Sequence, residues 1–208
     1  MISLGSLHQR HLHPRRVRVL AGHFAPLLPA SGRVLDIGCG DGLLTEALKR
    51  IRPDLEFQGI DVLVRPDTPI PVHRFDGTEI PDAAGSFACA LLVDVLHHAE
   101  DPTRLLSEAS RVAKEVLIKD HLLEGLFARP VLSFMDWVGN ARHGVRLTYD
   151  YWTTARWRRE ISACGLRETA WKRDLRLYPP LADWIFGRGL HFIARLGKLE
   201  TPGPTDSR

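Results

Sequence analysis

The sequence has few cysteines, and the three that it has lie far apart. Cys39, Cys89 and Cys164 form no C-x-x-C pair and are odd in number. The pattern therefore indicates neither a zinc site nor a disulfide framework. From the sequence we expect no metal ion, and a reducing, cytoplasmic environment fits the free thiols.

Long apolar runs are also absent from the sequence. No stretch approaches the ~18 apolar residues that a membrane-spanning helix needs. No continuous apolar segment precedes the N-terminal histidines and arginines, which argues against a secretory signal peptide. The formal net charge of +3 is too small to indicate a nucleic-acid partner. The remaining expectation is a soluble chain whose 208 residues suffice for one domain with a sizeable core.

What the sequence does contain is a glycine-rich turn between a strand pattern and a helix pattern. Residues 34–37 have the length and apolar character of a buried parallel strand, and residues 43–51 carry apolar side chains at helical spacing. Glycine permits positive φ and lets a ligand approach bare main chain. The following helix N-terminus offers unpaired N–H groups. These features predict a ligand-binding loop made of Gly38, Cys39, Gly40, Asp41 and Gly42.

The spacing of the glycines separates two classes of ligand. A dinucleotide site of the G-x-G-x-x-G type needs a glycine three positions after the second one, but Leu43 stands there. The third glycine is Gly42 instead, and the strand before the loop carries Asp36. This G-x-G-x-G pattern with an acidic residue in the strand resembles motif I of the class I S-adenosylmethionine (SAM)-dependent methyltransferases.

Two later segments continue the resemblance in the expected order. Residues 55–62 read as a second strand that carries Asp61, about 20 residues beyond the glycines, where an acid can hold ribose hydroxyls. In the family, the matching post-I motif does this. After a third strand at 71–75, Asp76 and Gly77 resemble motif II, which holds adenine. Taken alone, either acid could be an ordinary turn aspartate.

The fourth strand pattern ends in a histidine pair. Residues 86–93 are almost continuously apolar, as a central parallel strand should be, and Asp94, His97 and His98 follow. The stretch Asp-Val-Leu-His-His-Ala-Glu-Asp-Pro at 94–102 closely resembles the motif IV region of small-molecule methyltransferases. Ligands of open α/β sheets bind beyond the carboxyl ends of the strands. This loop should therefore face the transferable methyl group.

The resemblance covers roughly residues 30–120 and implies the rest of the architecture. We expect an α/β, Rossmann-like, doubly wound and mostly parallel seven-stranded sheet with an antiparallel last strand. One domain should span residues 1–198, with a helical cover over 1–30 and a disordered tail at 199–208. Three prolines within 63–71 predict a loop where many relatives have a helix. A strand pattern runs from 166 to 178.

The resemblance also implies the cofactor, SAM, with S-adenosylhomocysteine (SAH) as product. SAM brings its own activated leaving group, so the protein mainly aligns the acceptor and excludes water. The cofactor-binding residues implied by the motifs are Asp36, Gly38, Cys39, Gly40, Asp41, Gly42, Asp61, Val62, Asp76, Gly77, Val93, Asp94 and His98.

A general base is needed only if the acceptor must lose a proton. The candidate catalytic residues are His98, His121 and His143. Asp94, Lys119 and Tyr149 are secondary candidates. The aromatic and apolar segment 122–152 could form a lid over the acceptor, extend the core as a helical hairpin, or make a dimer contact. A lid of this composition favours a small apolar or aromatic acceptor. Both a monomer and a homodimer remain open.

Three other functions compete with the methyltransferase interpretation. A module of this fold could bind SAM, SAH or a partner protein without catalysis, because the sequence shows no acceptor-side catalytic signature. A nicotinamide-dependent oxidoreductase conflicts with the position of the third glycine. A DNA amino-methyltransferase would carry an Asn/Asp-Pro-Pro-aromatic tetrapeptide after the fourth strand, which this sequence lacks.

Overall fold

The computed structural model describes residues 12–140, 148–187 and 189–199. Its strands are β1 (Gly32–Ile37), β2 (Leu55–Asp61), β3 (Val72–Arg74), β4 (Phe87–Val93), β5 (Ala113–His121), β6 (Leu166–Lys172) and β7 (His191–Lys198). They form one seven-stranded sheet in the order β3-β2-β1-β4-β5-β7-β6. Strands β1 to β5 are parallel, and β7 runs antiparallel to both β5 and β6. This confirms the predicted fold class.

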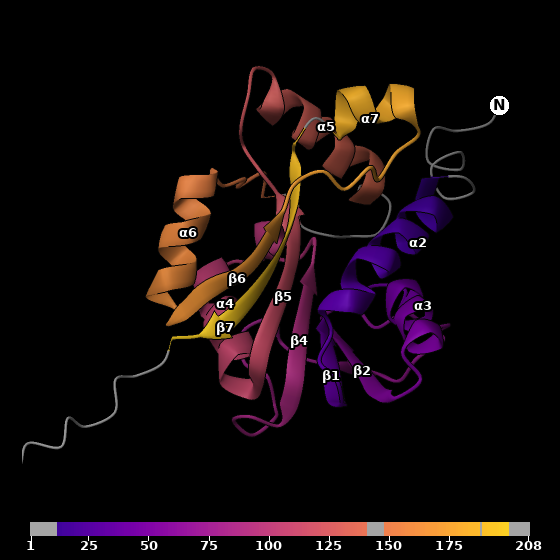
Figure 1. The fold of residues 1–208 in the computed structure, drawn as a ribbon, viewed down its shortest axis with the longest axis vertical. Helices are drawn as coiled ribbons and strands as arrows, with labels where there is room; N and C mark the ends of the chain where they lie inside the picture. Colours follow the sequence, from indigo (N-terminus) through magenta and orange to yellow (C-terminus); the bar gives the residue numbers. More distant parts are fainter. Residues whose placement is uncertain (1–11, 141–147, 188, 200–208) are drawn as a thin grey trace, which may run out of the picture.

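Helices cover both faces of the sheet. They are α2 (His13–Phe24), α3 (Leu43–Ile51), α4 (Pro102–Val112), α5 (Ala128–Asn140), α6 (Thr154–Ala163) and α7 (Pro180–Phe186), with short 3₁₀ turns η2 (Ala25–Leu27) and η3 (Leu96–His98). Helices α2 and α3 lie on one side of the sheet and α4 and α6 on the other (Figure 1). Helices α5 and α7 lie together beyond the end of β5 (Figure 1). In the described part of the chain, no helix is long and apolar enough to cross a bilayer.

Alternation along β1 sends its side chains into two cores. Leu35 packs in one cluster with Trp157 of α6, and Val34 packs in the other with Phe24 of α2 and Leu48 of α3. All five side chains are at most 2% exposed. Burial on both faces explains the continuous apolar character of the central strands.

Helix α4 begins where its sequence signal places it. The Asp101 carboxylate accepts a hydrogen bond from the main-chain N–H of Arg104 at 2.9 Å, and Pro102 occupies the first helical position. The cap fixes the start of α4, and the segment between Val93 and Asp101 is a short connection that contains the 3₁₀ turn η3.

Two connections test the sequence expectations. Between β2 and β3 the described chain forms no helix, as the prolines predict. The predicted strand at 166–178 is wrong in its second half, because β6 ends at Lys172. Leu175 and Leu177 alternate as strand residues would, yet they pack in the same core cluster as α2, and Arg176 between them has a positive φ of 49°. The chain then leads into α7.

Candidate active site

The glycine loop leaves one position open to a ligand. Gly38, Gly40 and Gly42 all have positive φ, between 61° and 72°. A Cβ at Gly38 would lie 2.5 Å from Cγ2 of Val95, and one at Gly42 would lie 2.9 Å from Cγ1 of Ile70. At Gly40 no neighbouring atom would come closer than 3.9 Å. The outer glycines therefore permit packing within the protein, whereas Gly40 offers bare main chain to solvent.

Asp61 joins the end of β2 to this loop. Its Oδ2 accepts from the N–H of Gly40 at 2.8 Å, and its Oδ1 accepts from the N–H of Leu63 at 2.8 Å. Asp61 is only 9% exposed. The carboxylate is thus fixed at the carboxyl end of β2 beside the open glycine, where the sequence predicts a ribose-binding acid.

Asp36 supports the loop from inside the sheet. It is 3% exposed and accepts a hydrogen bond from the hydroxyl of Thr45 on α3. Burial raises the pKa of Asp36 to about 7, against the lowering effect of that hydrogen bond. The geometry indicates a residue that holds α3 against β1 rather than one that touches a ligand.

The remaining cofactor candidates divide between ligand-facing and structural positions. Val62 is 42% exposed, and a Cβ at Gly77 would lie 3.1 Å from its Cγ1, so these two residues adjoin at the ends of β2 and β3. Asp76 is exposed and accepts from the N–H groups of Thr78 and Glu79 at 2.7 and 2.9 Å. Its carboxylate therefore orders its own turn.

Helix α2 reaches the other side of the loop. His13 Nε2 lies 2.9 Å from Oδ2 of Asp41. The half-buried Cys39 packs its Sγ against Gly59, and burial raises the pKa of its thiol. Val93 ends β4 beside Lys119 of β5. Each of these residues lies close to the loop or at the neighbouring strand ends.

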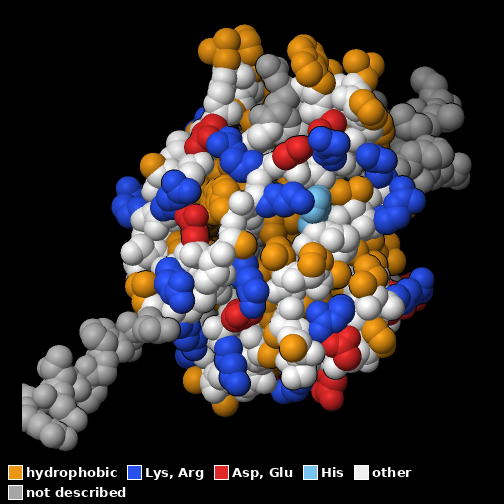
Figure 2. Space-filling view, viewed as in Figure 1, with side chains coloured by type: hydrophobic (Ala, Val, Ile, Leu, Met, Phe, Trp, Pro, Cys, Tyr) orange, Lys and Arg blue, Asp and Glu red, His pale blue; other side chains and the backbone are white. Residues whose placement is uncertain are grey.

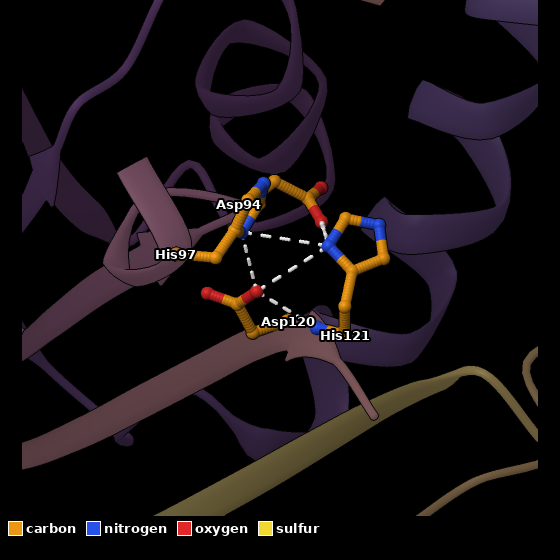
Figure 3. Close-up of side chains that lie close together, drawn as sticks. All are labelled: Asp94, His97, Asp120 and His121. Carbon is orange, nitrogen blue, oxygen red and sulfur yellow. Dashed lines mark hydrogen bonds and ion pairs between the residues drawn. The ribbon is translucent and has the colours of Figure 1, made fainter. Parts of the chain in front are cut away.

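A second group of polar side chains lies at the carboxyl ends of β4 and β5 (Figure 3). His97 Nδ1 is 2.6 Å from Oδ1 of Asp120, and that oxygen also accepts from the N–H of His121 at 2.7 Å. His121 Nδ1 lies 3.4 Å from His97 Nδ1 and 3.8 Å from Oδ1 of Asp94. We call Asp94, His97, Asp120 and His121 the strand-end network.

Two cations hold the Asp94 corner of the strand-end network. The Arg16 guanidinium of α2 and the Lys119 ammonium each donate to one carboxylate oxygen of Asp94. Burial alone would raise the pKa of Asp94, but these cations hold it well below its usual range. His191 of β7 lies 3.2 Å from Lys119 Nζ. Asp94 itself has a positive φ of 56°, which turns the chain sharply after β4.

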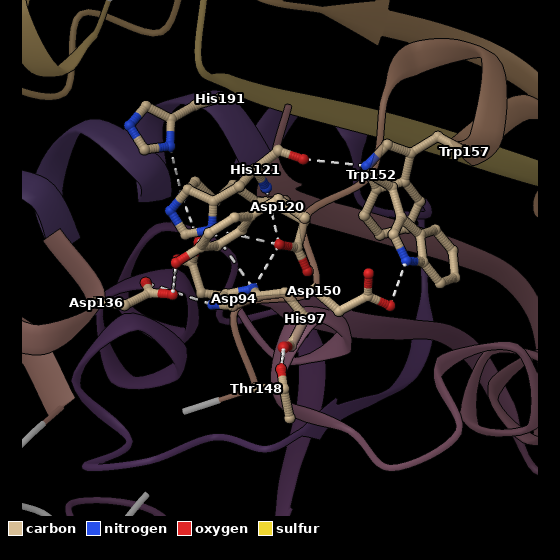
Figure 4. Close-up of polar contacts among 12 residues, drawn as sticks. Asp94, His97, Asp120, His121, Asp136, Thr148, Asp150, Trp152, Trp157 and His191 are labelled. Atoms are coloured by element: carbon tan, nitrogen blue, oxygen red, sulfur yellow. Dashed lines mark hydrogen bonds and ion pairs between the residues drawn. The ribbon is translucent and has the colours of Figure 1, made fainter. Parts of the chain in front are cut away.

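Residues after β5 enclose the network from the far side (Figure 4). Oδ1 of Asp136, on α5, lies 3.5 Å from Nε2 of His97, and the hydroxyl of Tyr151 donates to the same carboxylate. The hydroxyl of Thr148 donates to the main-chain oxygen of His97. Helix α5 and the returning chain are therefore bonded to the strand-end network.

The surrounding charges set different protonation states on the three histidines. Burial alone would lower the pKa of His97, but Asp120 and Asp136 outweigh it and raise the value to about 10. Burial and the positive charge on His97 lower the pKa of His98 to about 4. The same two causes, with Lys119, lower the pKa of His121. At neutral pH, His97 is charged while His98 and His121 are neutral.

The predicted catalytic residues differ in their burial and surroundings. His98 is half-buried, and its ring centroid lies 3.9 Å from that of His97. His121 is buried at 5% exposure, and Tyr149 lies on the returning chain two residues before Tyr151, whose ring contacts that of His121. His143 lies outside the described residues. The sequence did not single out Asp120, Asp136 or Arg16.

The strand-end network also has the composition of a metal site. One ligand atom from each of its four residues lies within 4.8 Å of the others, as do atoms of His97, His98 and Asp136. Two histidines and two carboxylates suit several divalent metals. Asp94 is already bonded to Arg16 and Lys119, so a metal would compete with two cations. This set was not predicted from the sequence, because its members follow two different strands.

Comparison with known proteins agrees with the fold. A family model described as a methyltransferase domain matches residues 7–178. The ubiquinone biosynthesis O-methyltransferase of Xanthomonas axonopodis pv. citri is 29% identical over 115 residues, covering 50% of this chain and 46% of that protein. The Xylella fastidiosa protein of the same name is 28% identical over 179 residues, covering 72% of this chain and 70% of that protein. This chain thus aligns with about half the length of the first relative.

A solved structure extends the likeness to nearly the whole chain. The 1,6-didemethyltoxoflavin-N1-methyltransferase of Burkholderia thailandensis, with bound 1,6-didemethyltoxoflavin and SAH, superposes with a TM-score of 0.64 at 17% identity. The superposition covers 89% of this chain and 79% of that one. The fold is therefore that of the class I SAM-dependent methyltransferases. The chain belongs to the methyltransferase-domain family.

Proposed function

We propose that this protein transfers the methyl group of SAM to a hydroxyl group of a small, apolar or aromatic molecule. The observation that carries the proposal is the arrangement of histidines where β4 and β5 end: the neutral His98 lies against the charged His97 of the strand-end network, and the neutral His121 lies beside Asp94. An acceptor hydroxyl must lose its proton during transfer, and a neutral imidazole can take it. The names of the relatives, O-methyltransferases of ubiquinone biosynthesis, support the same acceptor atom.

The residues of the glycine loop fit SAM. The open main chain at Gly40 would receive the methionine part, Asp61 would hold the ribose hydroxyls, and Val62 with Gly77 would flank the adenine. When bound, SAM supplies a methyl group on a positively charged sulfur. The chain's own task is then to orient the acceptor and to exclude water.

His98 is the residue we assign to the acceptor proton. It is half-buried, whereas His97, His121 and His191 are at most 5% exposed. Its pKa of about 4 keeps it neutral at physiological pH. The charged His97 is held in position by Asp120, and its ring lies tilted against that of His98. Because His121 contacts Asp94 and His97 rather than the open side, we assign it a positioning role.

The first experiment is calorimetric titration of the protein with SAM and SAH, alongside Asp61→Ala. We expect the variant to bind at least ten-fold more weakly, a loss of about 1.4 kcal/mol. Asp54→Ala is the matched control, because the exposed Asp54 precedes the opposite end of β2 and pairs there with Arg52. Failure of the folded wild type to bind SAM would contradict the proposal.

A transfer assay then separates an enzyme from a binding module. SAH release is measured with phenols, catechols and hydroquinones as acceptors, for the wild type and His98→Gln. Loss of a general base typically costs 10²–10⁴-fold in rate, so kcat should fall by about 10²-fold while SAM affinity stays the same. Tight SAM binding without transfer to any hydroxyl would favour a non-catalytic module.

A further inference from the structure

One end of the molecule exposes a group of large apolar side chains. It is formed by the turn before α5, by α5 and by α7, which lie side by side. Every aromatic residue among the strongly exposed apolar side chains of the described chain lies here. We call this group the apolar end; its members are Leu126, Phe127, Phe134, Trp137, Leu181, Trp184 and Ile185.

These side chains point outward although α5 already buries another of its faces within the protein. On α5, Leu132 is fully buried and Asp136 is 4% exposed, while Phe134 and Trp137 are 47% and 54% exposed. A surface helix of a globular protein normally presents polar residues on its outer side. Figure 2 shows the outermost part of this end as several separate apolar tips. Separate tips suit a deformable partner better than a flat protein surface.

The turn before α5 holds its apolar residues outward at a conformational cost. Phe127 has a positive φ of 66°, which is rare for a bulky side chain. It is nevertheless 67% exposed, and its neighbour Leu126 is 86% exposed. The positive φ of Phe127 therefore does not help to bury its side chain within the protein. Such strain is typical of binding segments.

Basic residues surround the apolar end. Arg129 on α5 is exposed and donates to the main-chain oxygen of Tyr149. A surface hollow beside the chain that leads into α7 is lined by Arg15, His23, Lys172, Asp174 and Arg176, with Val19 and Leu175, so Asp174 is its one acid. A band of charged side chains, many of them basic, lies directly behind the apolar tips (Figure 2).

Two acidic side chains at this end form hydrogen bonds within the protein. Asp136 is buried against His97 and Tyr151. Asp183 of α7 accepts from the main-chain N–H of Tyr178 at 3.1 Å. A lipid surface has anionic headgroups above an apolar interior. The basic residues could contact the headgroups while the exposed tryptophan, phenylalanine and leucine side chains contact the interior.

We propose that the apolar end docks on the surface of a lipid bilayer that contains anionic lipids. The apolar tips enter the boundary between headgroups and acyl chains, as interfacial helices do, and the arginines remain at headgroup level. The strand-end network is bonded to the same helix, since Asp136 of α5 lies 3.5 Å from His97. Docking would therefore place the acceptor side of the site next to the membrane.

The test is co-sedimentation of the full chain with vesicles of phosphatidylcholine alone and of phosphatidylcholine mixed with phosphatidylglycerol. We expect the wild type to pellet with the mixed vesicles and to be released by high salt. The variants are Leu126→Ser/Phe127→Ser and Trp184→Ser, which should each reduce the bound fraction several-fold. Ile51→Ser is the control, because Ile51 is 50% exposed at the far end of α3.

Three results would overturn the proposal. The wild type could stay in the supernatant with both kinds of vesicle, or the apolar-end variants could bind as well as the wild type. Sedimentation without lipid could also show a dimer that the same variants dissociate, which would assign the surface to a second copy. Unchanged SAM titration and thermal unfolding of the variants would show that these residues act on the surface alone. The vesicle assay needs neither SAM nor an acceptor, so its outcome is independent of the proposed transfer reaction.

Discussion

The two halves of the candidate site are held together in different ways. The glycine loop and Asp61 come from short segments, and the bond that joins them runs from the main-chain N–H of Gly40 to a carboxylate. The strand-end network depends on side chains that bond to one another. Besides its four members, it draws on Arg16 of α2, Lys119 of β5, Asp136 of α5 and His191 of β7.

This difference separates ligand binding from stability. At Gly40 an added Cβ would have no close neighbour, and Asp61 is held by main-chain N–H groups, so substitutions at these two residues should act on the ligand first. In the network, the charge of each group depends on its neighbours: His97 is charged because of two carboxylates, and His98 is neutral partly because His97 is charged. A substitution there should disturb the fold as well as the chemistry.

The largest effect should come from removing a charge inside the network. Asp120→Asn keeps the shape of the side chain but removes one of the negative charges that balance the buried positive charge of His97. Breaking a buried ion pair on one side typically costs about 3–5 kcal/mol, and we expect an unfolding free energy lower by about that amount. Urea unfolding followed by circular dichroism measures it.

The control for this comparison is an ion pair on the surface. Glu168→Ala removes the partner of Arg158, which is 59% exposed by its side chain. Exposed pairs are worth about 0–1 kcal/mol. If both variants lost the same small amount of stability, the strand-end network would not be a coupled, buried set of charges.

The pH dependence of stability should show the charge on His97. Its pKa is about 10 in the folded protein and near 6.5 when unfolded. The folded state therefore binds more protons between these values, and the stabilisation from His97 is complete below pH 6.5 and lost as the pH rises through 10. One proton corresponds to a slope of up to about 1.4 kcal/mol per pH unit.

His97→Asn is the variant that isolates this effect. Its amide nitrogen can replace the Nδ1 donor to Asp120 without a titrating charge. The difference in unfolding free energy between wild type and variant should shrink as the pH rises from 6.5 to 10. A constant difference over this range would show that His97 is neutral in the folded protein.

The same contrast explains what could be predicted from the sequence. The glycine loop, Asp61 and the strands before them carry local signals, because glycine spacing and apolar runs are visible within a few residues. The helical cover over the loop was also expected, and α2 does bond to Asp41 and Asp94 through His13 and Arg16. The individual contacts of His13 and Arg16 were not predicted.

The network could not be predicted in this way. The sequence flagged His98 and His121 as separate candidates, but Asp120 and Asp136 gain their meaning only when β4, β5 and α5 come together. The error at 166–178 has a related cause. Leu175 and Leu177 look like strand residues, yet their burial against α2 is a tertiary contact that alternation along the chain cannot reveal.

The smallest stability effect expected within the candidate site itself comes from the loop half, where two glycines can be compared. Gly40→Ala meets open space, so its cost is the positive φ alone, about 1–2 kcal/mol for a residue with a Cβ. The methyl group would nevertheless occupy the approach to the main chain, and we expect SAM affinity to fall at least ten-fold. Gly38→Ala has the same φ penalty and adds a contact of 2.5 Å with Val95, so it should lower the unfolding free energy further. Calorimetry measures SAM binding by both variants, and urea unfolding measures their stability. If Gly40→Ala bound SAM normally, the ligand would approach the loop elsewhere. The division between a ligand-facing and a structural glycine would then be wrong.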